Sequence, residues 1–253
     1  MRLQKYILNE DSRGIEIGLD EAITILKTNC QEALANRNFI FRGVEAKREY
    51  YIISPARSTR ISRNTHNYYT LLFDNLQTWK KYPKRSKSII CTTDSRYALD
   101  QGYTYVVFPF DSAKIGVCPS EDIWGAFRPK LDVLSNFNDD IRALVIEYKL
   151  SSPNTYRELT NFFKEVDNIK DTIISDRWLA HDSPFWKLYL DNPDLKLIDF
   201  IKNFFNPDKH GFKLTTIKDF NITENREIWT DSTSILILQE QMDELQNMLN
   251  PAS

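Results

Sequence analysis

The sequence is poor in glycine, cysteine and histidine. It holds seven glycines, and neither G-x-G-x-x-G nor G-x-x-x-x-G-K-[ST] occurs, which excludes a glycine-rich loop that cradles a dinucleotide or a nucleotide phosphate. The three cysteines and three histidines include no C-x-x-C pair. This argues against a structural zinc site, and we expect no metal. Widely spaced cysteines in odd number are typical of reduced thiols in the cytosol.

Long apolar runs are also missing. No stretch approaches the length of a membrane-spanning helix, and residues 1–10 do not resemble a signal peptide. We therefore expect a soluble, cytoplasmic protein without a membrane partner. Hydrophobic residues make up 42% of the chain and aromatic residues 13%, which is enough for a sizeable core. The length of 253 residues suits one large domain that carries an insertion.

Positive charge is concentrated in residues 57–94. The basic side chains of this stretch are Arg57, Arg60, Arg63, Lys80, Lys81, Lys84, Arg85 and Lys87, against the acidic Asp74 and Asp94. Because the whole chain has a net charge of -2, this concentration predicts a phosphate-bearing partner. A solvated basic face without a ligand is the alternative.

Apolar patterns predict a mixture of helices and strands. Helices are expected at residues 19–36, 64–79, 95–101, 141–148, 154–169, 171–179, 195–205 and 240–249. Strands are expected at residues 38–44, 50–54, 88–93, 103–110, 114–118, 212–217 and 227–238. Asp20 is the expected N-cap of the first helix, and Pro109 suggests a strand that ends near a sheet edge. The order predicts a single α+β domain over residues 1–253, with a split mixed or antiparallel sheet interrupted by a helical insertion at about 130–208.

Three short segments carry groups suited to chemistry. Arg42 and Gly43 lie on an apolar strand, where a desolvated guanidinium calls for an anion such as phosphate, unless it simply faces water. Thr92 and Thr93 end a later strand, and their hydroxyls can line a cleft or cap the helix that follows. Glu227 begins an apolar strand, either as a buried, oriented acid or as an exposed edge residue.

Taken in this order, the arginine, the hydroxyl strand and the late glutamate resemble the ADP-ribosyltransferase family, in its arginine–serine–glutamate class. The resemblance covers about residues 38–127 and 211–238, and it includes an alanine-containing helix after the hydroxyl strand. It implies a sheet of ADP-ribosyltransferase type, NAD as substrate, and Arg42 as the NAD anchor. It also implies Glu227 as the catalytic residue, with Thr92 steadying it. Glu227 lies farther downstream than in the family, which requires the helical block to be an insertion.

Further residues are assigned to the pocket by the resemblance or by their chemistry. They are Gly43, Thr93, Tyr68, Tyr69, Arg57, Arg60 and Arg63. The tyrosine pair can stack on nicotinamide or belong to the core, and the evenly spaced arginines can bind the NAD pyrophosphate or the phosphates of an acceptor. Glu121 is a second candidate for the catalytic acid. Asn225 stands where arginine-modifying members carry a glutamate, so we expect an acceptor other than arginine.

Two functions follow from these patterns. The first is an NAD-dependent mono-ADP-ribosyltransferase that modifies a protein or a nucleic acid. The alternative is a non-catalytic nucleic-acid-binding protein that uses the basic residues 57–87, with Tyr68, Tyr69 and Trp79 as stacking groups. The two merge if the acceptor is itself DNA or RNA.

Overall fold

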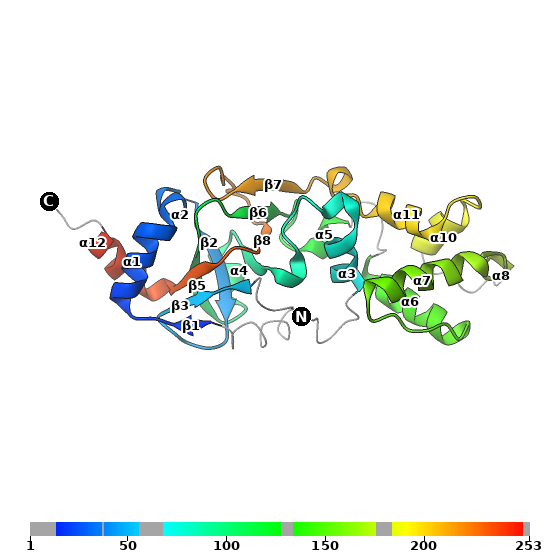
Figure 1. Ribbon diagram of the computed structural model, residues 1–253, viewed down its shortest axis with the longest axis horizontal. Helices are drawn as coiled ribbons and strands as arrows, with labels where there is room; N and C mark the ends of the chain where they lie inside the picture. Colours follow the sequence, from blue (N-terminus) through cyan, green and yellow to red (C-terminus); the bar gives the residue numbers. More distant parts are fainter. Residues whose placement is uncertain (1–13, 37, 56–67, 128–133, 176–183, 250–253) are drawn as a thin grey trace. The chain divides into compact units, whose positions relative to one another are not determined.

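The chain divides into two compact units, one built on a sheet and one built from helices (Figure 1). The computed structural model describes residues 14–36, 38–55, 68–127, 134–175 and 184–249. The first unit comprises residues 1–64, 81–121 and 212–253, and the second comprises residues 65–80 and 122–211. The helical block predicted at about 130–208 lies within the second unit, which also takes in the earlier segment 65–80.

The first unit contains a nine-stranded open sheet in which every registered pair of strands is antiparallel. Its strands are β1 (Ile15–Glu16), β2 (Ile40–Val44), β3 (Tyr50–Ile53), β4 (Ile89–Thr92), β5 (Tyr103–Pro109), β6 (Lys114–Val117), β7 (Lys213–Thr216), β8 (Glu227–Thr230) and β9 (Ser234–Leu238). They lie in the order β1-β3-β9-β5-β2-β4-β8-β6-β7. The prediction of an α+β chain is confirmed, and of the mixed or antiparallel sheet that was predicted, the structure has the antiparallel form.

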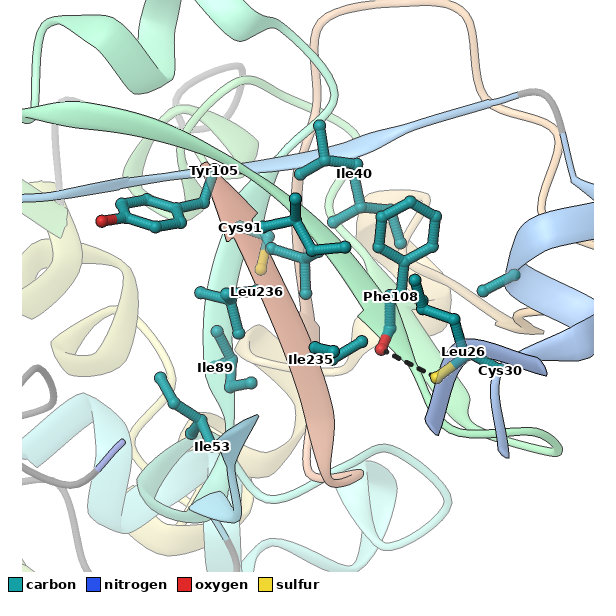
Figure 2. Close-up of a cluster of buried hydrophobic side chains, with 14 of the residues drawn as sticks. Leu26, Cys30, Ile40, Ile53, Ile89, Cys91, Tyr105, Phe108, Ile235 and Leu236 are labelled. Atoms are coloured by element: carbon teal, nitrogen blue, oxygen red, sulfur yellow. Dashed lines mark hydrogen bonds between the residues drawn. The ribbon is translucent and has the colours of Figure 1, made fainter. Parts of the chain in front are cut away.

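The core of this unit forms where helices cover the middle of the sheet. The helices are α1 (Leu19–Asn29), α2 (Gln31–Ala35) and α12 (Met242–Leu249), which contribute buried residues to this core, whereas α4 (Ser95–Leu99) lies against β2 at Gly43. All five residues of β9 are buried, as expected for an apolar strand between two others. Figure 2 shows Leu26 of α1 beside Phe108 and Ile235, and Cys30 donating its thiol hydrogen to the carbonyl of Phe108, with 3.6 Å between sulfur and oxygen.

The second unit packs around aromatic side chains. Its elements are α3 (Tyr68–Asn75), α5 (Ile123–Ala126), α6 (Leu134–Glu147), α7 (Tyr156–Asn168), α8 (Lys170–Ser175), α10 (Pro184–Leu190) and α11 (Leu197–Phe204), with short 3₁₀ turns at Gln77–Trp79 and Pro207–His210. The ring of Phe73 lies 4.5 Å from Trp79, 6.0 Å from Phe127 and 6.0 Å from Phe205, measured between centroids. Edge and stacked contacts of this kind make the core of the unit.

Several sequence predictions need correction. The predicted helix 19–36 is interrupted at Cys30, and Gly18, not Asp20, is the N-cap of α1. Pro109 does end β5, but β5 is an interior strand between β9 and β2. Registered pairing with β2 stops at Val107, so the N–H that proline lacks costs no hydrogen bond to β2. Helix α10 is an element that the sequence patterns did not predict.

Candidate active site

The three strands that carry the predicted arginine, threonine and glutamate are neighbours in the sheet, in the order β2-β4-β8. Thr92 at the end of β4 pairs in register with Glu227 at the start of β8. On its other side Thr92 pairs with Phe41, next to Arg42 on β2. The fold therefore joins segments that are far apart in sequence, and it sets Thr92 directly opposite Glu227.

Arg42 lies at the seam between β2 and β4. These two strands share one registered pair, Phe41 with Thr92, whereas β2 and β5 share five. Beside that pair, Arg42 Nη1 donates a hydrogen bond of 2.8 Å to the carbonyl of Ile90 on β4. Because successive residues of a strand project to opposite faces, the ladder directs Arg42 away from the face that carries Thr92 and Glu227. The structure thus brings the three strands together, and it pairs the threonine with the glutamate more directly than either with the arginine.

Glu227 is a buried acid, with 7% of its surface exposed. Its Oε1 accepts a hydrogen bond of 2.7 Å from Arg85 Nη1, and the two side chains are 9% and 10% exposed. Its backbone is also fixed, since its N–H donates to Ser120 O and its carbonyl accepts from Cys118 N. A buried charge pair with this geometry holds both partners in one orientation. The exposed-edge alternative for Glu227 is therefore wrong.

Arg85 completes this cluster, and sequence reasoning gave it no role at the site. Its guanidinium carbon lies 5.1 Å from the ring centroid of Trp229, two residues after Glu227 on the same face of β8. Trp229 donates its indole N–H to Pro83 O at 2.9 Å and stacks on Tyr82 at 6.0 Å between centroids. The only sequence signal for Arg85 is its position just before an apolar strand. The same stretch holds seven other basic residues, so this signal does not distinguish Arg85 from them.

The hydroxyl groups of β4 belong to a polar network. Thr92 Oγ1 lies 3.2 Å from Asn225 Oδ1, and Asn225 Nδ2 lies 3.4 Å from Glu121 Oε2. Thr93 Oγ1 donates to Glu224 O and accepts from the backbone N–H of residue 226. The second candidate acid, Glu121, is thus connected to Thr92 through Asn225, but it is exposed, whereas Glu227 is buried.

The helix after β4 has its own cap. Asp94 accepts a hydrogen bond from the backbone N–H of Arg96 and pairs with the Arg96 side chain, which holds the Asp94 pKa below its usual value. Toward this helix, Thr92 makes one contact: its Oγ1 accepts a hydrogen bond from the N–H of the N-cap residue, Asp94. The capping role is therefore carried by Asp94, which leaves the hydroxyl hydrogen of Thr92 directed to Asn225.

Gly43 has a packing reason to be glycine. A Cβ at this position would come within 2.1 Å of the carbonyl oxygen of Ala98 and 2.6 Å of Gln101 Cβ. The end of α4 therefore lies directly on β2 at the residue after Arg42. This close approach accounts for the Arg-Gly sequence without any ligand.

The remaining predicted residues lie outside this cluster or outside the described part of the chain. Tyr68 and Tyr69 belong to the second unit, where both are buried and Tyr69 packs against Phe73 and Phe205. Of the two alternatives given for these tyrosines, stacking on nicotinamide or a place in the core, the structure shows the place in the core. Trp79 is buried in the same unit and donates its indole N–H to Phe205 O. Arg57, Arg60 and Arg63 fall outside the described residues.

Within the described residues, no cluster of histidine, cysteine, aspartate or glutamate is placed to hold a metal ion. Over the same part of the chain, no helix combines the length and the apolar character needed to span a bilayer. Comparison with protein-family models, with curated proteins and with solved structures found no match to this chain.

Proposed function

We propose that this protein is an NAD-dependent mono-ADP-ribosyltransferase that modifies a macromolecular acceptor. The observation that carries the proposal is the registered pair of Thr92 with the buried Glu227. In the family that the sequence resembles, a hydroxyl strand steadies the catalytic glutamate. Here the two groups lie on adjacent strands, as that role requires. The assignment of Glu227 to the first unit and of residues 122–211 to the second agrees with an insertion between the hydroxyl strand and the glutamate.

The chemistry asks for a fixed negative charge beside the ribose. As the bond between nicotinamide and ribose breaks, nicotinamide leaves with the electron pair and the ribose gains oxocarbenium character, as in glycoside hydrolysis. A preorganised carboxylate in a site with little water stabilises that charge, and such groups are worth several kcal/mol. The acceptor's nucleophilic atom then bonds to the ribose carbon and releases its proton to the solvent. Glu227 meets the requirement of rigidity, because Arg85 and two backbone hydrogen bonds hold it.

Arg42, which the resemblance makes the NAD anchor, lies on the neighbouring strand, but the ladder directs it to the face opposite Thr92 and Glu227, so the proposed chemistry at Glu227 does not depend on it. Its guanidinium is buried, with 5% of the residue exposed, and it lies where β2 and β4 share a single registered pair. Asn225, beside Thr92, is the residue that we assign to recognition of an acceptor other than arginine.

A single incubation with labelled NAD tests the proposal. The purified protein is incubated with a cell lysate, and the products are treated with protease or with nuclease to separate protein from nucleic-acid acceptors. We expect a labelled macromolecule that requires the wild-type protein. Salt-sensitive binding of an oligonucleotide with no consumption of NAD would instead support the nucleic-acid-binding alternative.

Two variants locate the acid. Glu227→Gln keeps the side-chain shape but removes the charge, and we expect transfer to fall by about 1,000-fold. Glu121→Gln, at the second candidate acid, should lower transfer by less than about 10-fold. Thermal melting of both variants is needed as a control, because Glu227 belongs to a buried ion pair. The opposite pattern, with loss only in the Glu121 variant, would move the catalytic role to Glu121.

A further inference from the structure

Arg85 differs from the other described basic residues of its segment. Lys80, Lys81 and Lys84 are exposed, whereas 9% of Arg85 is exposed. It lies in a short 3₁₀ turn, Arg85–Lys87, immediately before β4. Removing a guanidinium from water is costly unless a partner with good geometry compensates. The position of Arg85 is therefore specified by what surrounds it.

The surroundings fix the guanidinium from two directions. Its edge meets Glu227 Oε1 at 2.7 Å, and its carbon lies 5.1 Å from the Trp229 ring centroid. Glu227 and Trp229 share one face of β8, so a single strand presents both the carboxylate and the aromatic ring. Trp229 is itself held by Pro83 O and by Tyr82. Arginine suits this place better than lysine, because its planar fork can stack on a ring and bond to a carboxylate together.

We propose that Arg85 is the positioning residue for Glu227 in the reaction described above, an inference that rests on the proposed function. Holding one carboxylate oxygen fixes the direction of the whole carboxylate, so the negative charge is in place before the ribose becomes positive. Arg85 acts through Glu227 and need not touch the substrate. Its loss should lower the rate of the chemical step and leave the binding of NAD almost unchanged.

Steady-state kinetics of NAD turnover distinguish a positioning role of Arg85 from direct binding of NAD and from no role in the reaction. We expect Arg85→Gln to lower kcat by at least about 100-fold while the KM for NAD changes by less than about 3-fold. Arg85→Lys keeps the charge but loses the fork, and it should recover part of the rate. In Arg85→Ala, millimolar guanidinium should raise kcat by occupying the vacated place between Glu227 and Trp229.

Arg48→Gln is the matched control. Arg48 belongs to the same unit, lies 5.5 Å from the Tyr51 ring centroid and donates to Gly14 O, so it also makes a cation–π contact and a backbone hydrogen bond. Its replacement should lower stability, by less than replacement of the buried Arg85, and should leave kcat unchanged. Melting curves of all variants identify those that are folded at the assay temperature. If Arg85→Gln is unfolded there, the increase of kcat by guanidinium in Arg85→Ala tests the proposal in its place.

The outcomes distinguish the inference from the function on which it rests. A raised KM with unchanged kcat in Arg85→Gln would mean that Arg85 binds NAD directly, and wild-type values of both constants would mean that it has no part in the reaction. Either result overturns the inference and leaves the transferase intact. If the wild-type protein turns over no NAD, the proposed function fails, and the positioning role fails with it.

Discussion

The indole of Trp229 occupies the space where a side chain at Gly116 would begin. These two residues are paired across β6 and β8, and a Cβ at Gly116 would lie 2.3 Å from Trp229 Cε2. Only glycine lets the ring lie flat over β6, where it supports Arg85 and, through it, Glu227. The residue at position 116 thus affects the candidate active site without belonging to it.

Gly116→Ala should therefore destabilise the protein. A methyl group at this place forces the buried indole to move, and overpacking of this kind costs about 1–3 kcal/mol. Urea unfolding measures the loss, and the fluorescence of tryptophan reports the displaced ring. Unchanged stability together with an unchanged spectrum would show that the ring does not fill this space.

Gly18→Ser, in contrast, should stabilise the protein. Gly18 is the N-cap of α1 without a side-chain cap, and no atom lies within 4 Å of a Cβ built there. A serine hydroxyl can accept a hydrogen bond from the first turn of the helix, which is worth a few tenths of a kcal/mol relative to glycine. The same urea titration checks this, and a destabilised Gly18→Ser protein would contradict the described cap geometry.

Cys30 should make stability depend on alkaline pH. Burial raises the pKa of its thiol from 9.0 to about 12. Between these values the unfolded chain loses the thiol proton and the folded protein keeps it, so stability is complete below pH 9 and falls as pH rises toward 12. Between the two pKa values the slope from this group is about 1.4 kcal/mol per pH unit.

Cys30→Ala provides the comparison for the alkaline titration. The variant should be less stable near neutral pH, because it leaves a small cavity beside Phe108. Its stability should nevertheless fall less than that of the wild type above pH 9. Parallel pH profiles of the two proteins would mean that the Cys30 thiol ionises equally easily in both states.

Among the described lysines of the second unit, Lys170 should be the one whose substitution lowers stability most. It is buried, and its Nζ donates to the carbonyls of Asn192, Pro193 and Leu195 at 2.7–3.1 Å, while Tyr189 lies under the charge at 4.0 Å. Lys170→Met leaves those carbonyls without this donor, and we expect a loss of about 3 kcal/mol.

Lys164→Met is the control for that measurement, because Lys164 is exposed on α7. Its effect should stay within about 0.5 kcal/mol. Chemical unfolding followed by circular dichroism suits this helical unit. Equal effects at the two positions would mean that the three carbonyl contacts add nothing to stability.

The strands were largely predictable, because each one carries its own local signal. The predicted strand 103–110 is β5, Tyr103–Pro109, and the predicted strand 50–54 is β3, Tyr50–Ile53. Apolar and β-branched residues with turn residues at the ends are sufficient for such predictions. The segment 227–238 was expected as strand, and it forms the two strands β8 and β9 with a short connection.

Partners across the sheet were not predictable, because pairing depends on residues far apart in sequence. Nothing local to Pro109 indicates that β2 ends before reaching it. The hydrogen bond that the Cys30 thiol donates to Phe108 O likewise joins residues 78 positions apart.

The site shows the same division. Arg42, Thr92 and Glu227 could be selected by residue type, and the structure places their strands side by side. Arg85 could not be selected, because its burial comes from Glu227, 142 positions later in the chain. A cation and its partner that are so far apart leave no pattern in either segment alone.

The position of the last two strands has a consequence for how the chain matures. β8 lies between β4 and β6, and β9 lies between β3 and β5, so residues 227–238 fill interior places of the sheet between strands that come earlier in the sequence. These gaps can close only after the chain has been synthesised beyond residue 238. Until then, β3, β4, β5 and β6 each lack a neighbouring strand on one side, which slows folding and allows these strands to pair wrongly. Premature termination before residue 227 should yield an aggregation-prone fragment that depends on chaperones.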